Sequence, residues 1–189
     1  MPFGSQIEWF EELPSTMDLA AAKGREGAPE GLIIIAERQT AGRGRQGRTW
    51  ASPKGGVWLS LLLRPALPPA SLGLLSICFG VAAAATISRM TQLPVKVKWP
   101  NDLLVNEKKL AGLLIESSIS SGKVGFAVLG LGINVNIKSQ DLPEELRRIA
   151  TSLLIETGEH WSCRQFIKLF LEQAETSYNQ LLAGQEQDI

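Results

Sequence analysis

A run of glycine and arginine, GRGRQGR at residues 42–48, has the residue types for chemistry on anions. This arginine loop carries three guanidinium groups on a backbone that three glycines leave almost free of side chains. Main-chain N–H groups and fixed positive charge can therefore come close to a carboxylate or a phosphate.

The arginine loop also matches the letters G-x-G-x-x-G of the dinucleotide-binding fingerprint. That fingerprint opens a helix and has an acidic residue about 20 positions later. Here Pro53, Gly55 and Gly56 follow instead, and residues 57–70 contain no Asp or Glu. The arginine loop is therefore predicted to serve a different anion site, or to be a flexible lid over one.

Three further segments place Lys, Asn, Asp and Gly beside apolar runs: KWPND at 98–102, KKLAGLLIE at 108–116 and GLGINVN at 130–136. Each segment alone has a purely structural interpretation, namely a turn after a strand, solvent-facing hairpin lysines, or a β-bulge at Gly130 and Gly132. Together they indicate a site at the ends of strands, where a scaffold usually presents one.

The charges in these segments are suited to joining two anions. We expect the cations to neutralise a substrate carboxylate and a nucleotide phosphate that otherwise repel each other; they are Arg43, Arg45, Arg48 and Lys109.

The neighbouring polar residues suit the same chemistry. Asp102 is expected to hold Mg²⁺, directly or through water, because this ion takes one or two carboxylates plus phosphate oxygens. Asn101 and Asn134 are expected to orient phosphate or ribose groups. No Ser/His/Asp or Cys/His combination is evident, so charge stabilisation and positioning must carry the catalysis.

Composition narrows the class of protein. The 189 residues suit one domain that buries a core without disulfides or metals. The 19 basic and 19 acidic residues balance, which argues against nucleic acid as a partner. Cys78, Cys163 and His160 do not supply a zinc site from Cys and His alone. We expect both cysteines to be buried and reduced in a cytoplasmic protein.

Two segments bear on targeting. Residues 1–13 are acidic and lack the apolar region of a signal peptide. The uncharged stretch 65–88 is long enough to span a bilayer, but its prolines and small residues favour a buried helix. No membrane partner is expected.

The elements that must position the site follow from the apolar pattern. A short helix is expected from Ser15 as N-cap, with Asp18 three residues on, to Gly24 as its stop. Strands are expected at 32–36, 57–63, 95–99, 103–105, 109–116 and 123–129. Further helices are expected at 70–90, 144–150 and 162–182. The pattern predicts an α+β fold with helices packed on a mixed, mostly antiparallel sheet. We expect the chain to form a single domain, 1–189, with a helical tail at 143–189.

The segments GRGRQGR, KWPND, KLAG and GLGINVN resemble those of the biotin protein ligases in order and spacing. The resemblance runs from Glu8 to Asn136 and more weakly through the tail. It implies a class II synthetase-like catalytic domain that activates biotin with ATP to biotinyl-5′-AMP, releasing pyrophosphate. Biotin then passes to one lysine of a carboxylase's biotin carboxyl carrier domain. The resemblance further implies ATP, biotin and Mg²⁺ as ligands and a cytoplasmic location, and it leaves a homodimer open.

The resemblance also implies roles for individual residues. The biotin-binding set is Ser15, Thr16, Gln39, Gly42, Arg43, Gly44, Arg45, Lys109 and Gly130. The ATP- and adenylate-binding set is Arg48, Trp50, Asn101, Asp102 and Asn134. The catalytic set is Lys109, Arg45 and Asp102, with Asp102 holding Mg²⁺. The arginine loop is expected to become ordered around biotin before ATP binds.

The chain departs from the family pattern at Met17, where Asn is common, and ring recognition is expected to survive. After Asn136 the chain reads as helices, so the C-terminal β-barrel domain of many members is expected to be absent. The N-terminal winged helix that binds DNA in some members is also expected to be absent.

Three alternatives remain. A lipoate or octanoate ligase relative shares the fold, but lipoate ligases have a different Gly-rich signature. Octanoyltransferases need a catalytic Cys, and neither Cys78 nor Cys163 lies in a suitable loop. A nucleic-acid-binding module built on three arginines would bind weakly and leave the other segments unexplained. A truncated biotin- or adenylate-binding domain with impaired transfer is the third alternative, because the absent domain could serve ATP binding or carrier docking.

Overall fold

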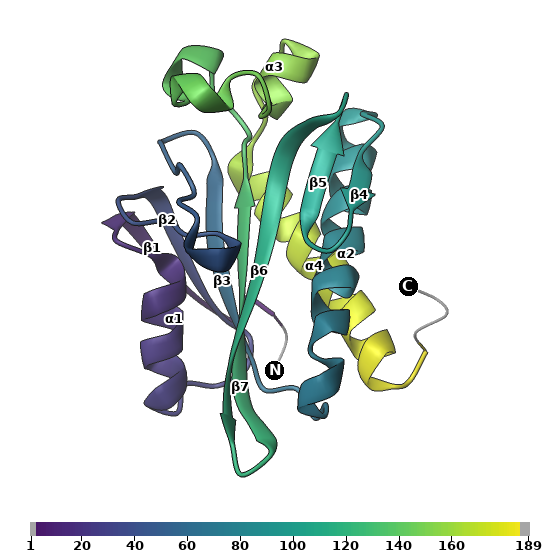
Figure 1. The fold of residues 1–189 in the computed structure, drawn as a ribbon. Helices are drawn as coiled ribbons and strands as arrows, with labels where there is room; N and C mark the ends of the chain where they lie inside the picture. Colours follow the sequence, from purple (N-terminus) through teal and green to yellow (C-terminus); the bar gives the residue numbers. More distant parts are fainter. Residues whose placement is uncertain (1–2, 186–189) are drawn as a thin grey trace.

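The protein is described by a computed structural model that covers residues 3–185. A seven-stranded sheet lies at its centre in the order β1-β2-β3-β7-β6-β5-β4 (Figure 1). The strands are β1 Gln6–Leu13, β2 Leu32–Gln39, β3 Val57–Leu63, β4 Lys96–Lys98, β5 Asp102–Val105, β6 Lys108–Ser120 and β7 Lys123–Ile133. β1 pairs parallel to β2 and the other pairs are antiparallel. The predicted α+β fold with a mixed, mostly antiparallel sheet is confirmed.

Helices cover both faces of the sheet. The helices are α1 Thr16–Arg25, α2 Gly73–Thr91, α3 Leu153–Thr157 and α4 Cys163–Leu182. α1 lies on one face against β2, β3 and β7, while α2 and α4 pack on each other at the opposite face (Figure 1). The sheet is therefore the middle layer of three.

The central strands are buried on both faces because their apolar runs supply side chains in both directions. Ile33 and Ile35 of β2 join the core beneath α2 and α4, whereas Leu32 and Ile34 join the smaller core beneath α1. This alternation is the pleat of a strand. An uninterrupted β-branched run suits such a position.

Helix α1 begins as predicted but is held differently. Ser15 is the N-cap residue, yet its side chain makes no capping hydrogen bond. Its hydroxyl instead accepts a hydrogen bond from Arg43, and Asp18 forms an ion pair with the same arginine. The helix continues past Gly24 to Arg25. A Cβ at Gly24 would lie 2.9 Å from Leu62 and Phe126, so this glycine serves close packing and the predicted stop was wrong.

Several other elements differ from expectation. β1 and α3 were not predicted, and segment 144–150 contains only a 3₁₀ turn at Glu144–Leu146 rather than a helix. β2, β6 and β7 run past their expected ends, to Gln39, Ser120 and Ile133.

Gly130 and Gly132 pair regularly with both neighbouring strands, so the bulge interpretation was wrong. Residues 186–189 of the expected tail lie outside the described residues.

Together with the 3₁₀ turn Pro69–Ser71 before it, helix α2 is long and apolar enough to cross a membrane by length and composition, over Pro69–Thr91. In the structure, its residues Phe79, Ala82 and Ala83 are fully buried in the core shared with α4 and the sheet. A core helix of a folded domain meets the same length criterion, and we interpret α2 as one.

The two cysteines are both free. Cys78 is buried within α2, and burial raises the pKa of its thiol to about 12. Cys163 is half-buried at the start of α4, where burial also raises its pKa. Full burial was thus predicted correctly for Cys78 alone.

One hydrogen bond ties α4 to the segment between α1 and β2, and we expect it to contribute to stability. The Tyr178 hydroxyl donates to Glu30 Oε1 at 2.7 Å, and the same oxygen accepts from the Arg64 main chain. Tyr178→Phe should lower the free energy of unfolding by about 1–2 kcal/mol, because a half-buried hydrogen bond to a carboxylate is lost while the ring contacts remain. Urea unfolding measures this.

The matched control is Thr176→Ala on the exposed side of α4, which should change the unfolding free energy by less than about 0.5 kcal/mol. An equal effect of both variants would show that the Tyr178 bond has no special weight.

Candidate active site

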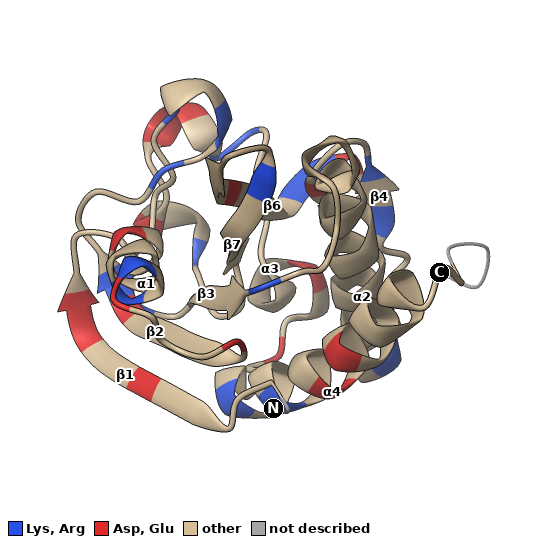
Figure 2. Ribbon diagram, turned by 90° about the horizontal axis from the view of Figure 1, so that it is seen from below, with Lys and Arg blue, Asp and Glu red and all other residues tan. Residues whose placement is uncertain are grey.

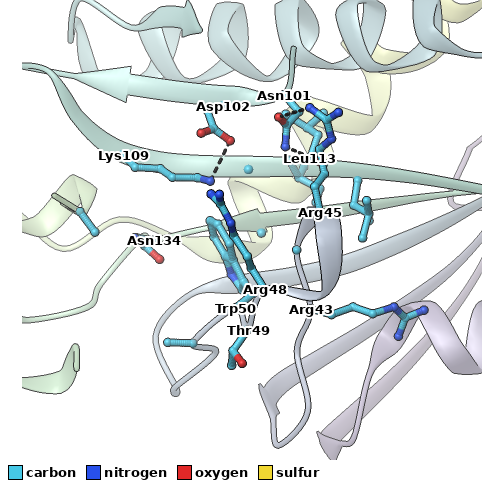
Figure 3. A pocket seen from close by; sticks show the side chains of 18 of the residues that line it. Arg43, Arg45, Arg48, Thr49, Trp50, Asn101, Asp102, Lys109, Leu113 and Asn134 are labelled. Carbon is cyan, nitrogen blue, oxygen red and sulfur yellow. Dashed lines mark hydrogen bonds and ion pairs between the residues drawn. The ribbon is translucent and has the colours of Figure 1, made fainter. Parts of the chain in front are cut away.

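A cavity of about 640 Å³ opens between α1, the arginine loop and the ends of β5, β6 and β7 (Figure 3). All of the residues predicted for the site except Gly42 line it. They are Ser15, Thr16, Gln39, Arg43, Gly44, Arg45, Arg48, Trp50, Asn101, Asp102, Lys109, Gly130 and Asn134. The chain therefore brings together in space what the sequence placed in separate segments.

A fixed hydrogen-bond network forms the polar end of the cavity. Gln39 Oε1 accepts from the Thr16 main chain at 2.8 Å and from the Thr16 hydroxyl at 3.1 Å. Gln39 Nε2 donates to the Ser52 hydroxyl at 2.9 Å, and the buried Ser60 hydroxyl donates to Thr16 Oγ1 at 2.8 Å. Since these partners fix the amide and the hydroxyls, the polar end is preorganised.

An apolar wall lies next to that network. Met17 is 5% exposed and packs against Gly130 of β7. A Cβ at Gly130 would lie 2.6 Å from the Met17 sulfur, so only glycine fits there without displacing the thioether. The residue that departs from the family pattern thus forms part of the cavity wall.

The arginine loop folds back on itself. Arg43 and Thr49 form an antiparallel bridge, and the Gly44 N–H donates to the Arg48 carbonyl at 2.7 Å. Gly42 is buried at the base of the loop, where a Cβ would lie 2.6 Å from the Trp50 carbonyl oxygen. Gly42 therefore shapes the loop and does not itself line the cavity, and its role in biotin binding stays a prediction.

The arginines of the loop have different partners. Arg43 Nε and Nη2 donate to Glu116 at 3.0 and 2.8 Å, and Nη1 lies 2.7 Å from Asp18 Oδ1. The hydrogen bonds with Glu116 and the two carboxylate charges raise the pKa of Arg43. Arg45 Nη1 donates to the neutral side chain of Asn101 at 3.2 Å. In Figure 3 Arg43 points away from Lys109 and Asp102, whereas Arg45 extends to Asn101.

Lys109 lies at the centre of the site. Its Nζ forms an ion pair with Asp102 Oδ1 at 2.7 Å and lies 5.0 Å from the centre of the Trp50 ring. Its main chain is held by segment 149–151, because Lys109 N donates to the Ile149 carbonyl and its own carbonyl accepts from Thr151. Both the main chain and the ammonium group of Lys109 are therefore held in place.

Trp50 lies on a surface made by two glycines. Gly112 of β6 and Gly132 of β7 are directly paired. Added Cβ atoms would lie 2.9 and 2.6 Å from the Trp50 ring. The indole Nε1 is buried and has no hydrogen-bond partner among the described residues. The ring is thus held by packing rather than by a polar contact.

The two asparagines hold neighbouring segments in place. Asn101 Nδ2 donates to the Leu113 carbonyl at 2.9 Å, and the buried Asn134 Nδ2 donates to the Thr151 carbonyl at 2.8 Å. Each amide also lines the cavity. Their first role in the structure is therefore to join strand ends to the adjacent loop.

Sequence reasoning missed some cavity residues. Gly112 and Gly132 line the cavity but were not assigned to the site. Glu116 does not line the cavity, but it binds the cavity residue Arg43 and received no role. Segment 142–150 lines the opposite wall with apolar residues; these are Leu142, Leu146, Ile149 and Ala150. Their spacing of three and four residues was the available signal, and it was interpreted only as a helix.

The described residues contain no group of three or more His, Cys, Asp or Glu side chains able to hold a metal ion. Asp102 is a lone carboxylate in the cavity, and Glu107 at its margin pairs with Lys96 at 2.8 Å. A single carboxylate fits Mg²⁺ bound mainly through phosphate and water oxygens, and does not fit a site built from protein alone.

Comparison with known proteins agrees with this geometry. Residues 9–134 match the model of the biotin/lipoate A/B protein ligase family. The chain is 41% identical over 157 residues to the bifunctional ligase/repressor BirA of Bacillus subtilis, covering 82% of this chain and 48% of that protein. It is 37% identical over 155 residues to the biotin–[acetyl-CoA-carboxylase] ligase of Mycobacterium tuberculosis, covering 79% of this chain and 55% of that protein. The chain thus spans about half the length of these relatives.

A solved structure extends the match over nearly the whole chain. Biotin protein ligase from Aquifex aeolicus, in complex with biotin and ATP, superposes with a TM-score of 0.80 at 31% identity. The match covers 95% of this chain and 72% of that one. The sheet, the cavity and both kinds of match therefore lead to one assignment: the chain belongs to the biotin/lipoate A/B protein ligase family.

Proposed function

We propose that this chain is the catalytic domain of an ATP-dependent biotin protein ligase. It converts biotin and ATP to biotinyl-5′-AMP and pyrophosphate, and then transfers biotin to a lysine of a biotin carboxyl carrier domain. The supporting observation is that one cavity joins a preorganised polar end at Thr16 and Gln39 to a cationic centre at Lys109. Relatives named as biotin ligases and a neighbour solved with biotin and ATP support the substrate class.

The polar end suits the biotin ring system. A ureido group presents both donors and acceptors, and Thr16 and Gln39 present fixed hydroxyl and amide groups next to buried Ser15. Met17 and Gly130 supply the apolar wall for the rest of the ring. The valerate chain then extends toward Lys109 and the arginine loop.

The opposite end suits a nucleotide. Trp50 offers an aromatic face against which adenine can stack, and Asn101, Asn134 and Arg48 line the same cavity. Asp102 is the residue that would hold Mg²⁺, which when bound neutralises phosphate charge.

The chemistry requires two anions to meet. In the first step a biotin carboxylate oxygen bonds to the α-phosphorus of ATP, and the bond from that phosphorus to the bridging oxygen breaks, releasing pyrophosphate. Lys109 and Arg45 stabilise the charge that develops on the phosphoryl oxygens, in a site organised before the reaction. In the second step the amine of the carrier lysine attacks the acyl carbon, an amide forms, and AMP leaves.

Two other functions have less support. The cavity lining contains no cysteine: Cys78 lies in the core with α2, and Cys163 contacts the carbonyls of Gly55 and Gly56. An octanoyltransferase nucleophile is therefore not in place. For nucleic acid a basic face is expected, whereas Figure 2 shows Lys and Arg spread over several elements and interspersed with Asp and Glu. A cytoplasmic location and a homodimer stay predictions.

Biotin-dependent exchange between ATP and pyrophosphate, with Mg²⁺, tests the proposal directly. We expect exchange with biotin and none above background with lipoate or octanoate. Exchange with lipoate or octanoate instead would overturn the substrate assignment. Biotin binding without exchange would identify a binding domain that lacks the adenylation step.

Lys109→Ala tests the cationic centre. Removing the ammonium should lower the exchange rate by about 10²–10³, the usual effect of losing one charge-stabilising group in a preorganised site. Calorimetric biotin affinity should change less than the rate does. Lys123→Ala, at the distant start of β7, is the control and should leave the exchange rate unaltered. An unchanged rate in Lys109→Ala would refute the role given to this lysine.

Gly132→Ala tests the surface beneath Trp50. The new Cβ would lie 2.6 Å from the indole nitrogen and displace the ring. The KM for ATP should rise about tenfold, since overpacking costs ~1–3 kcal/mol, while biotin affinity stays near that of the wild type. Gly125→Ala on the same strand meets only an ordinary contact at 3.5 Å and is the control. Equal losses in the KM for ATP and in biotin affinity would contradict the assignment of Trp50 to the nucleotide end of the cavity.

A further inference from the structure

Two carboxylates beside the cavity have no part in the reaction described above. Glu116 lies on β6 and Asp18 in the first turn of α1. Both bind Arg43, which belongs to the arginine loop and was expected to serve an anionic ligand. Their contacts with this arginine suggest a different use for it.

The donors of the Arg43 guanidinium are already engaged by protein oxygens. Glu116 accepts from Nε at 3.0 Å and from Nη2 at 2.8 Å, the two-pronged geometry that makes such pairs strong. Nη1 contacts Asp18 Oδ1 at 2.7 Å and donates to Ser15 Oγ at 3.1 Å. One side chain therefore joins the loop to α1 and to β6.

The charge balance argues against a direct role for Arg43 with an anion. Two carboxylates surround one guanidinium, so this corner of the site has no excess positive charge for a substrate carboxylate or phosphate. A ligand would have to compete with two carboxylates that already contact all three nitrogens of the guanidinium. Arg45, held only by a neutral amide, meets no such competition.

Because of its position in the loop, the attachment of Arg43 also determines where the neighbouring turn lies. Arg43 forms the bridge with Thr49 at the base of the folded-back segment. Residues 44–48 form the turn between these two, closed by the hydrogen bond from Gly44 to Arg48. Fixing Arg43 thus fixes where the turn lies over the cavity, and Arg45 reaches Asn101 from that turn.

We propose that Glu116, assisted by Asp18, is a positioning residue that holds the arginine loop over the cavity through Arg43. Arg43 acts by this attachment and does not contact either anion. The effect on adenylate retention rests on the proposed function, whereas the attachment itself belongs to the ligand-free fold.

A double-mutant cycle tests the mechanism of this effect. Arg43→Met and Glu116→Gln should each raise the dissociation rate of biotinyl-5′-AMP about tenfold, as expected for loss of a charge-assisted pair. The double variant should be no worse than Arg43→Met alone, because both changes remove the same attachment. Glu116→Asp, which keeps the carboxylate, should restore part of the loss. Independent, additive effects would overturn the proposal, since Arg43 would then act on the ligand itself.

Trypsin cleavage of the ligand-free protein provides a readout that does not depend on activity. Arg45 and Arg48 are cleavage sites within the turn. Glu116→Gln should raise the cleavage rate after these residues about fivefold or more, because the open population of the loop increases when a pair is lost. The control is Glu12→Gln, which removes a surface pair with Arg38 at 3.0 Å and should leave that rate unchanged.

The two experiments separate the proposals. Wild-type protein without biotin-dependent exchange would defeat the proposed function, and the trypsin result would still decide on the attachment. Equal cleavage of wild type and Glu116→Gln, at matched thermal stability, would defeat the attachment and leave the ligase assignment unaffected.

Discussion

The register between β6 and β7 is the constraint on which the site depends. Gly112 lies opposite Gly132, and Leu114 lies opposite Gly130. These glycines leave the space that Trp50 and Met17 fill. Because side chains alternate along a strand, a slip of one residue would turn the cavity-facing side chains of β6 toward the helices on the other side. The cavity therefore receives its shape from backbone pairing before any ligand enters.

The cations around the cavity differ in how firmly they are held. Arg43 binds two carboxylates, Lys109 binds one, and Arg45 binds only a neutral amide. A cation is held more firmly by a carboxylate than by a neutral amide, so the freedom of each cation to change partners increases in that order. Under the proposed function, the site would thereby combine one firm attachment of the arginine loop with cations that are freer to meet the two anions.

The sequence predicted β3 to the residue, because its apolar run is bounded by Gly56 and by Arg64 before a proline. It also predicted which segments meet at the cavity, since each motif follows an apolar run. It missed β1, whose three glutamates resemble a surface segment and whose parallel partner β2 lies beyond α1. Ser15 has the type and place of a helix cap, and only the distant Arg43 draws it into another contact. Competition of this kind arises in tertiary structure and leaves no local signal.

The arrangement of the strands also bears on how the cavity comes into being during folding. β1, α1 and β2 are consecutive, but β3 pairs with β7 across a long intervening chain. Closing so long a loop is costly in entropy and slow, so we expect β3 and β7 to pair late in folding. Thr16 and Gln39 lie on one side of it, and Lys109 lies on the other. Under the proposed function, a half-folded chain holds neither ligand in full, and binding draws the chain toward its completed state by mass action.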